Sequence, residues 1–199
     1  MILHNVLTEL DDVLSESGAL IDLYKAKELS FFGKTVKWLE KLEKLAADNK
    51  WSFQSPLAGL RGQLVTAARA QREDVFNWMP KSKNTRRARE ALAAETIRLA
   101  VDIASTYVSG DRALHYEASN LLRRLLAGAI LKGVVGLRPT NGNGRHIAQS
   151  WAAAASNPEF GPTCAHIVGL VGAYNAYILF DKCFDEIFIN GNGASMRHD

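Results

Sequence analysis

Apolar residues recur with the spacing of an α-helix along almost the whole chain, and this pattern constrains the fold more than any other feature. The clearest case is a stretch in which Tyr24, Phe31, Trp38 and Leu45 repeat every seven positions. A seven-residue apolar repeat is typical of helices that pack side by side. No segment shows the alternating pattern of a strand. We therefore predict an all-α protein, a helical bundle of about six to seven helices.

Glycine, proline and short polar runs set the expected helix ends. The predicted helices cover residues 2–15, 20–47, 55–80, 84–108, 112–132, 145–155 and 163–189. Ser17-Gly18 is expected to end the first helix, because glycine accepts the left-handed conformation found at helix ends. Ser109-Gly110-Asp111 is expected to form a tight turn between the fourth and fifth helices.

The same pattern divides the chain into three parts. Residues 1–80 form a helical N-terminal part, a long hairpin followed by a third helix. Residues 81–190 form a helical bundle, and residues 191–199 a flexible tail. A single domain also fits a chain of 199 residues with 47% hydrophobic residues, which is enough to bury a core.

Cysteine usage and hydropathy favour a cytoplasmic protein. Cys164 and Cys183 are the only cysteines, and no signal peptide is evident, so free thiols in a reducing compartment are expected. The most apolar stretch, Ala165 to Phe180, has 16 residues and contains His166 and Asn175. A membrane span needs roughly 20 mostly apolar residues. We therefore expect a buried core helix there and no membrane.

Positive charge is concentrated in the middle of the chain. Residues 61–145 carry fifteen Lys and Arg against seven acidic residues, a net charge of +8, whereas the whole chain carries +3. Such a field attracts polyanions, although ordinary solvated helix faces give the same count. Five basic residues of one linker are candidate nucleic-acid contacts: Lys81, Lys83, Arg86, Arg87 and Arg89. A solvated linker is the alternative interpretation.

A second basic group surrounds the loop between Arg138 and His146. Arg138 precedes a Pro-Thr-Asn-Gly-Asn-Gly run, and Arg145 and His146 follow it. Exposed backbone N–H groups and a helix N-terminus favour an anion, and the imidazole is suited to acid or base catalysis beside a ribose hydroxyl. An ordinary loop with incidental surface arginines would have the same composition.

The stretch from Gly133 to His146 resembles the motif of HEPN domains, most closely the C-terminal domain of abortive-infection proteins. In that family an Arg after one helix is followed by a glycine-containing loop and by a His that opens the next helix. The resemblance covers residues 85–190, with Ala165 to Phe180 as the apolar final helix. It implies a helical dimer whose paired loops face each other, and metal-independent RNA cleavage.

This sequence departs from the family in three ways. More residues separate Arg138 from His146 than is usual, Pro139 stands where a polar residue is usual, and Arg145 is an alternative for the His position. These departures bear on catalysis more than on the fold. If the resemblance holds, Arg138, Arg145 and His146 are the catalytic candidates.

The absence of a convincing catalytic set favours a non-enzymatic helical binding module over an enzyme. The histidines are scattered along the chain, at positions 4, 115, 146, 166 and 198, so we expect no metal and no cofactor. The expected partner is a second copy, giving a homodimer or larger homo-oligomer, or another protein. The alternative is a HEPN-like RNA-binding protein or ribonuclease of the phage-defence or toxin type, with RNA as partner.

Overall fold

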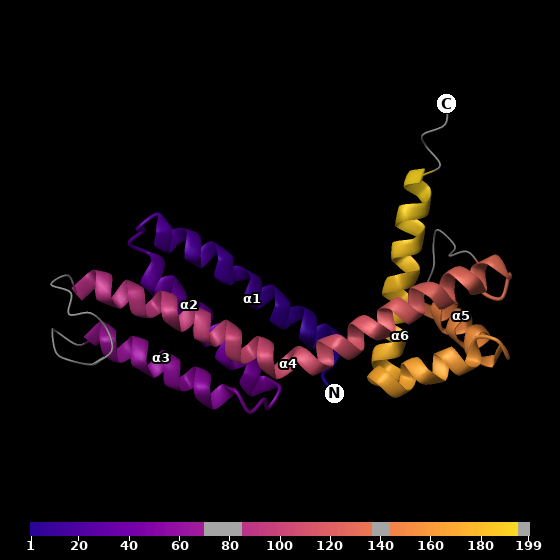
Figure 1. Ribbon diagram of the computed structural model, residues 1–199, viewed down its shortest axis with the longest axis horizontal. Coiled ribbons are helices and arrows are strands. Elements are labelled where there is room, and N and C mark those ends of the chain that lie inside the picture. The colour runs from indigo at the N-terminus through magenta and orange to yellow at the C-terminus, as the bar shows by residue number, and fades with distance from the viewer. Residues whose placement is uncertain (70–84, 137–143, 195–199) are drawn as a thin grey trace. The chain divides into compact units, whose positions relative to one another are not determined.

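The computed structural model describes residues 1–69, 85–136 and 144–194. This part of the chain contains six α-helices and no strand, which confirms the predicted all-α bundle. The helices are α1 (His4–Lys25), α2 (Phe31–Asp48), α3 (Gln54–Arg69), α4 (Thr85–Leu131), α5 (Gly144–Ser156) and α6 (Gly161–Ala194) (Figure 1).

The chain forms two compact units. The N-terminal unit is Asn5–Val108, and the C-terminal unit combines Met1–His4 with Ser109–Asp199. These units divide inside α4, which contributes residues to both, and not near residue 80, where the sequence pattern predicted a boundary. The first four residues therefore belong to the unit built mainly by the second half of the sequence.

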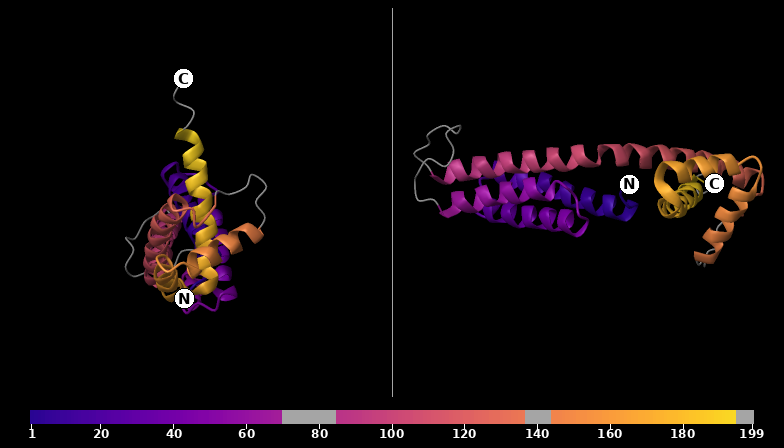
Figure 2. Two further views of the ribbon diagram at one scale, coloured as in Figure 1. Left: turned by 90° about the vertical axis from the view of Figure 1, so that its right-hand side faces the viewer. Right: turned by 90° about the horizontal axis from the view of Figure 1, so that it is seen from below.

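In the N-terminal unit, α1, α2, α3 and the first part of α4 run alongside one another (Figures 1 and 2). The seven-residue repeat lies in this core, since Phe31, Trp38 and Leu45 are buried. The indole Nε1 of Trp38 donates to the carbonyl oxygen of Val13 at 2.7 Å and so joins α2 to α1. These three residues of the repeat are thus used within the unit, whereas Tyr24 lies on α1 and is 37% exposed.

The break between α1 and α2 lies at residues 26–30 and not at Ser17-Gly18, so this predicted helix end was wrong. Lys27 has φ +58°, its N–H donates to the Tyr24 carbonyl at 3.0 Å, and the Glu28 N–H donates to the Leu23 carbonyl at 3.0 Å. This pair of bonds is a Schellman motif with lysine at the left-handed position that glycine usually occupies.

The end of α2 repeats this arrangement. Lys50 has φ +55°, its N–H donates to the Ala47 carbonyl, and the Trp51 N–H donates to the Ala46 carbonyl. The end of α4 is built in the same way with Gly133, whose φ is +67°. Three helices therefore stop at the same hydrogen-bonding motif, and only one of the three stops is marked by glycine.

The predicted turn at Ser109-Gly110-Asp111 is also wrong, because these residues lie inside α4, which is 47 residues long. A glycine inside a helix costs only about 1 kcal/mol relative to alanine. Buried residues on both sides, Val108 and Ala118 among them, keep the helix in place by packing. The shorter helix predicted at 145–155 matches α5 to within one residue at each end.

The C-terminal unit is built around α5, α6 and the second part of α4. Its core includes Leu122, Leu126, Ile167, Phe180 and Phe184, all with no more than traces of exposed surface. The final helix differs from the prediction because Gly172 has φ +77° and ψ +157°, which are not helical values. Figure 1 shows α6 changing direction along its length.

The segment Gly161–Ile187 of α6 is long and apolar enough to cross a membrane by length and composition alone, with a mean hydropathy of 1.4. The core helix of a soluble protein meets the same criteria. Only 39% of its apolar window is buried inside the structure. The other residues of this segment are half-buried or exposed, and the exposed ones include Ala165, Gly169, Ala173 and Tyr174.

Candidate functional site

The structure separates the residues that the sequence analysis grouped around the glycine-rich loop. Arg138 lies outside the described residues, and Arg145 is exposed in the first turn of α5. His146 is half-buried, and its ring meets that of Phe184 edge-on at a centroid distance of 6.0 Å. Its Nε2 is buried and has no hydrogen-bond partner in the described part of the chain.

Two of the predicted nucleic-acid contacts, Arg86 and Arg89, lie in the first turns of α4 and make contacts within the chain. Arg86 pairs with Glu90 at 2.6 Å and donates to the carbonyl oxygen of Lys27 at 2.8 Å. Arg89 approaches the carbonyl oxygen of Ala68 at 3.5 Å. These carbonyls lie just after the end of α1 and in the last turn of α3, where a helix lacks N–H donors and favours a positive charge.

Two of the five predicted nucleic-acid contacts thus have a structural role in the N-terminal unit. Arg87 is exposed, and Lys81 and Lys83 lie outside the described residues.

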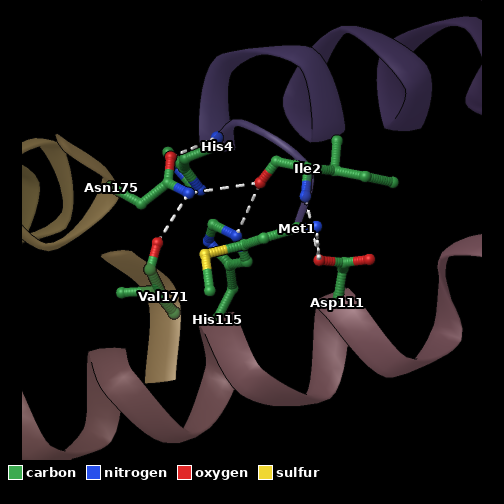
Figure 3. Close-up of polar contacts among 7 residues, drawn as sticks. All are labelled: Met1, Ile2, His4, Asp111, His115, Val171 and Asn175. Atoms are coloured by element: carbon green, nitrogen blue, oxygen red, sulfur yellow. Dashed lines mark hydrogen bonds and ion pairs between the residues drawn. The ribbon is translucent and has the colours of Figure 1, made fainter. Parts of the chain in front are cut away.

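A different set of polar side chains converges in the C-terminal unit, at the point where α6 breaks. We call it the polar junction: Ile2, His4, Asp111, His115 and Asn175 (Figure 3). Its members come from the N-terminal segment, from neighbouring turns of α4 and from α6. Met1 also reaches it, since an added Cβ at Gly172 would lie 3.4 Å from the Met1 Sδ.

Asn175 is the centre of the junction. Its Nδ2 donates to the carbonyl oxygens of Val171 at 2.9 Å and of Ile2 at 3.2 Å, and its Oδ1 accepts from the N–H of His4 at 2.9 Å. Only 3% of its surface is exposed. A buried amide with both donors and its acceptor engaged stabilises one arrangement of the chain, because any other leaves polar groups unpaired.

Asp111 fixes the other end of the N-terminal segment. Its Oδ1 accepts from the N–H of Ile2 at 2.9 Å and lies 3.9 Å from the Met1 amino group. The backbone of residue 2 is thus held on both sides, by α4 through its N–H and by α6 through its carbonyl.

His115 lies one turn after Asp111 and is 6% exposed. Its Nε2 is 3.1 Å from the Ile2 carbonyl oxygen, which only accepts, so Nε2 carries the proton. Its Nδ1 is buried without a hydrogen-bond partner in the described structure. Burial lowers the pKa of His115, against smaller opposing effects of the Ile2 hydrogen bond and of Asp111.

His4 completes the junction by stacking on His115, with ring centroids 5.5 Å apart and planes 23° apart. The sequence analysis treated these histidines as scattered, and 111 positions do separate them. Nothing in the local sequence marks either one, because their proximity depends on residues 1–4 lying against residues of α4 that are more than a hundred positions away.

Neither cysteine is prepared for catalysis. Cys164 and Cys183 are buried free thiols, and burial raises the pKa of both, that of Cys183 to about 11. Within the residues that the structure describes, no group of three or more His, Cys, Asp or Glu could hold a metal ion. The polar junction is a buried, hydrogen-bonded site that attaches residues 1–4 to α4 and α6.

Comparison of this chain with protein-family models, with curated proteins and with solved structures finds no match. The likeness to HEPN domains therefore remains a prediction from one short motif.

Proposed function

We propose that this chain is a non-enzymatic helical interaction module, and that it binds a second copy of itself through α6. The observation that carries this proposal is the uncovered apolar surface of α6. Its segment Gly161–Ile187 has a mean hydropathy of 1.4, and only 39% of its apolar window is buried. Apolar surface left in water is a common mark of a protein interface.

An exposed aromatic residue lies on this helix. Tyr174 is 59% exposed, two residues after the break at Gly172. Tyrosine is enriched at protein interfaces because it combines a large apolar ring with a hydroxyl group. On the same helix Ala165 and Gly169 are exposed four residues apart before the break, and Ala173 is exposed directly after it. Small residues let a second helix approach closely.

Sedimentation equilibrium over a range of concentrations tests self-association. We expect the mass to rise above the 21.9 kDa of one chain. Tyr174→Asp should weaken association by about tenfold or more, because it places a charge in an apolar interface. Tyr116→Asp is the matched control, since Tyr116 is a 70% exposed tyrosine on α4 of the same unit.

A constant mass of one chain at all concentrations would contradict self-association. A flotation assay with neutral phospholipid vesicles then tests whether the apolar surface of α6 binds a lipid bilayer instead. Flotation that Tyr174→Asp abolishes would assign the surface of α6 to a bilayer.

RNA binding is the second candidate, and the order of elements supports it. The chain ends α4 at Leu131 and opens α5 at Gly144, with Arg145 exposed and His146 in the first turn. The apolar α6 follows, as the resemblance to HEPN domains requires. Binding and cleavage of single-stranded RNA and tRNA at low salt would be compared for wild type, Arg138→Ala and Arg145→Ala/His146→Gln.

RNA cleavage by wild type that is lost in the variants would identify a ribonuclease. RNA binding without cleavage, weakened in the same variants, would identify a HEPN-like protein that has lost catalysis. His166→Gln is the control, because His166 is 59% exposed on α6. Wild-type protein that neither binds nor cuts RNA would reject this candidate.

A further inference from the structure

The stacked rings of His4 and His115, which we call the imidazole pair, are enclosed by the polar junction. Both ring nitrogens of His4 and the Nδ1 of His115 are shut off from solvent. The rings belong to two segments that are far apart in the sequence, and the backbone N–H of His4 is itself a donor to Asn175. A change in charge on either ring therefore acts directly on the attachment of residues 1–4.

The charged groups around His115 are few in the described structure. Asp111, on α4, is the one carboxylate that influences the pKa of His115. The N-terminal segment contributes the Met1 amino group, which lies 3.9 Å from Asp111, and the His4 ring. From α6, the uncharged amide of Asn175 shares the Ile2 carbonyl oxygen with His115 (Figure 3). Asp111 already interacts with two donors of the N-terminal segment, the Ile2 N–H and the Met1 amino group. Its carboxylate therefore stabilises a charge on His115 only weakly.

We propose that the imidazole pair is an acid-sensitive latch, whose protonation in mildly acidic solution releases residues 1–4 from α4 and α6. A second proton on His115 enters at Nδ1, where the described structure offers no acceptor. Two imidazolium rings stacked at a centroid distance of 5.5 Å would also repel each other in a medium of low dielectric constant. Release hydrates both rings and relieves both effects.

The direction of the pKa shift agrees with this assignment. Burial lowers the pKa of His115 in the folded protein, so the released state binds the proton more readily than the latched state. The latched state is fully favoured above the ordinary histidine pKa of about 6.5 and loses stability as the pH falls below it. This inference does not depend on the proposed function, because it concerns attachment within one chain.

Amide hydrogen exchange of the full chain, followed by NMR, tests the latch at His4. The His4 N–H donates to Asn175 Oδ1 only while the segment is attached. The protection factor of this N–H, which excludes the intrinsic pH dependence of exchange, should fall about tenfold between pH 7.5 and pH 5.5. The indole N–H of Trp38, in the N-terminal unit, is an internal reference for global unfolding and should keep its protection.

His115→Gln removes the titrating group and keeps an amide that can donate to the Ile2 carbonyl. We expect the fall in His4 protection to shrink to less than threefold in this variant, and to keep its wild-type size in His166→Gln. An unchanged wild-type protection factor would overturn the proposal. So would a fall shared by the Trp38 indole, or one of equal size in His115→Gln.

Ring titration by NMR keeps the proposal testable if His115→Gln does not fold. In wild-type protein, the ring of His115 should titrate below the ordinary histidine pKa of about 6.5. A midpoint for His115 at or above that value would equally overturn the latch.

Discussion

The side-chain Nδ2 of Asn175 donates to the carbonyl oxygen of Val171, one turn earlier in α6, at 2.9 Å. In an uninterrupted helix that carbonyl accepts from the backbone N–H four residues later. Gly172 departs from helical geometry directly after it, and the side chain of Asn175 lies where the helix breaks. The same amide then holds the N-terminal segment, so the break and the attachment share one residue.

Replacing Asn175 with alanine should lower the free energy of unfolding by about 2–4 kcal/mol, because the His4 N–H and at least one carbonyl lose a buried partner. Chemical denaturation followed by circular dichroism measures this change. Asn120→Ala is the control, since Asn120 is half-buried on α4 and only accepts from the exposed Arg123 at 3.3 Å. A loss below about 0.5 kcal/mol for Asn175→Ala would contradict the central role of this amide.

Gly172→Ala should destabilise the protein by about 1–3 kcal/mol, because φ +77° with ψ +157° is a conformation essentially confined to glycine. Gly169→Ala, three residues earlier in the same helix, should instead raise the free energy of unfolding by about 0.5–1 kcal/mol. A Cβ at Gly169 meets nothing within 4 Å. Thermal and urea denaturation of the two variants provide the comparison. Equal effects would mean that the break in α6 is not a stable feature.

Lys27→Gly should stabilise the N-terminal unit by about 0.5–1 kcal/mol, because lysine is held at φ +58° where glycine carries no steric penalty. Lys25→Gly is the matched control in the last turn of α1, where glycine should cost about 1 kcal/mol. Urea midpoints of the two variants should therefore move in opposite directions from wild type. A destabilised Lys27→Gly would indicate that α1 ends elsewhere.

Cys183 should resist thiol reagents at pH 8. A pKa of about 11 leaves about one thiol in a thousand ionised at that pH, and the side chain is 2% exposed. We expect modification of the native protein to be at least about a hundredfold slower than modification in urea, measured by the release of a chromogenic thiol. Cys164→Ser isolates the signal of Cys183. Rapid modification under native conditions would show that α6 opens readily from the core.

The sequence predicts the helices well where packing alone determines them. Phe31, Trp38 and Leu45 fall on one buried face because a helical repeat dictates it, and α5 was placed to within a residue at each end. Helix ends were harder. Ser17-Gly18 was expected to end the first helix, but α1 ends at the Schellman motif of Lys27, and Gly18 lies inside it. The choice between lysine and glycine at a helix end changes the free energy of folding by much less than the packing of the core does.

The polar junction lay beyond the reach of sequence patterns. His115 and Asn175 occupy positions that helical periodicity assigns to the interior. A single polar residue at such a position gives no indication of its hydrogen-bond partners. Their partners lie 113 and 171 positions away, at Ile2 and His4. The loop at Arg138, by contrast, is conspicuous in sequence, and its function stays a prediction.

The closing of the polar junction has a consequence for biosynthesis. Ile2 and Asn175 are 173 positions apart, so the ribosome exports residues 1–4 long before it makes their partner on α6. At about 5–20 residues per second, this interval is on the order of ten seconds or more. Until Asn175 emerges from the ribosome, residues 1–4 lack their partner on α6 and are open to any factor at the exit tunnel.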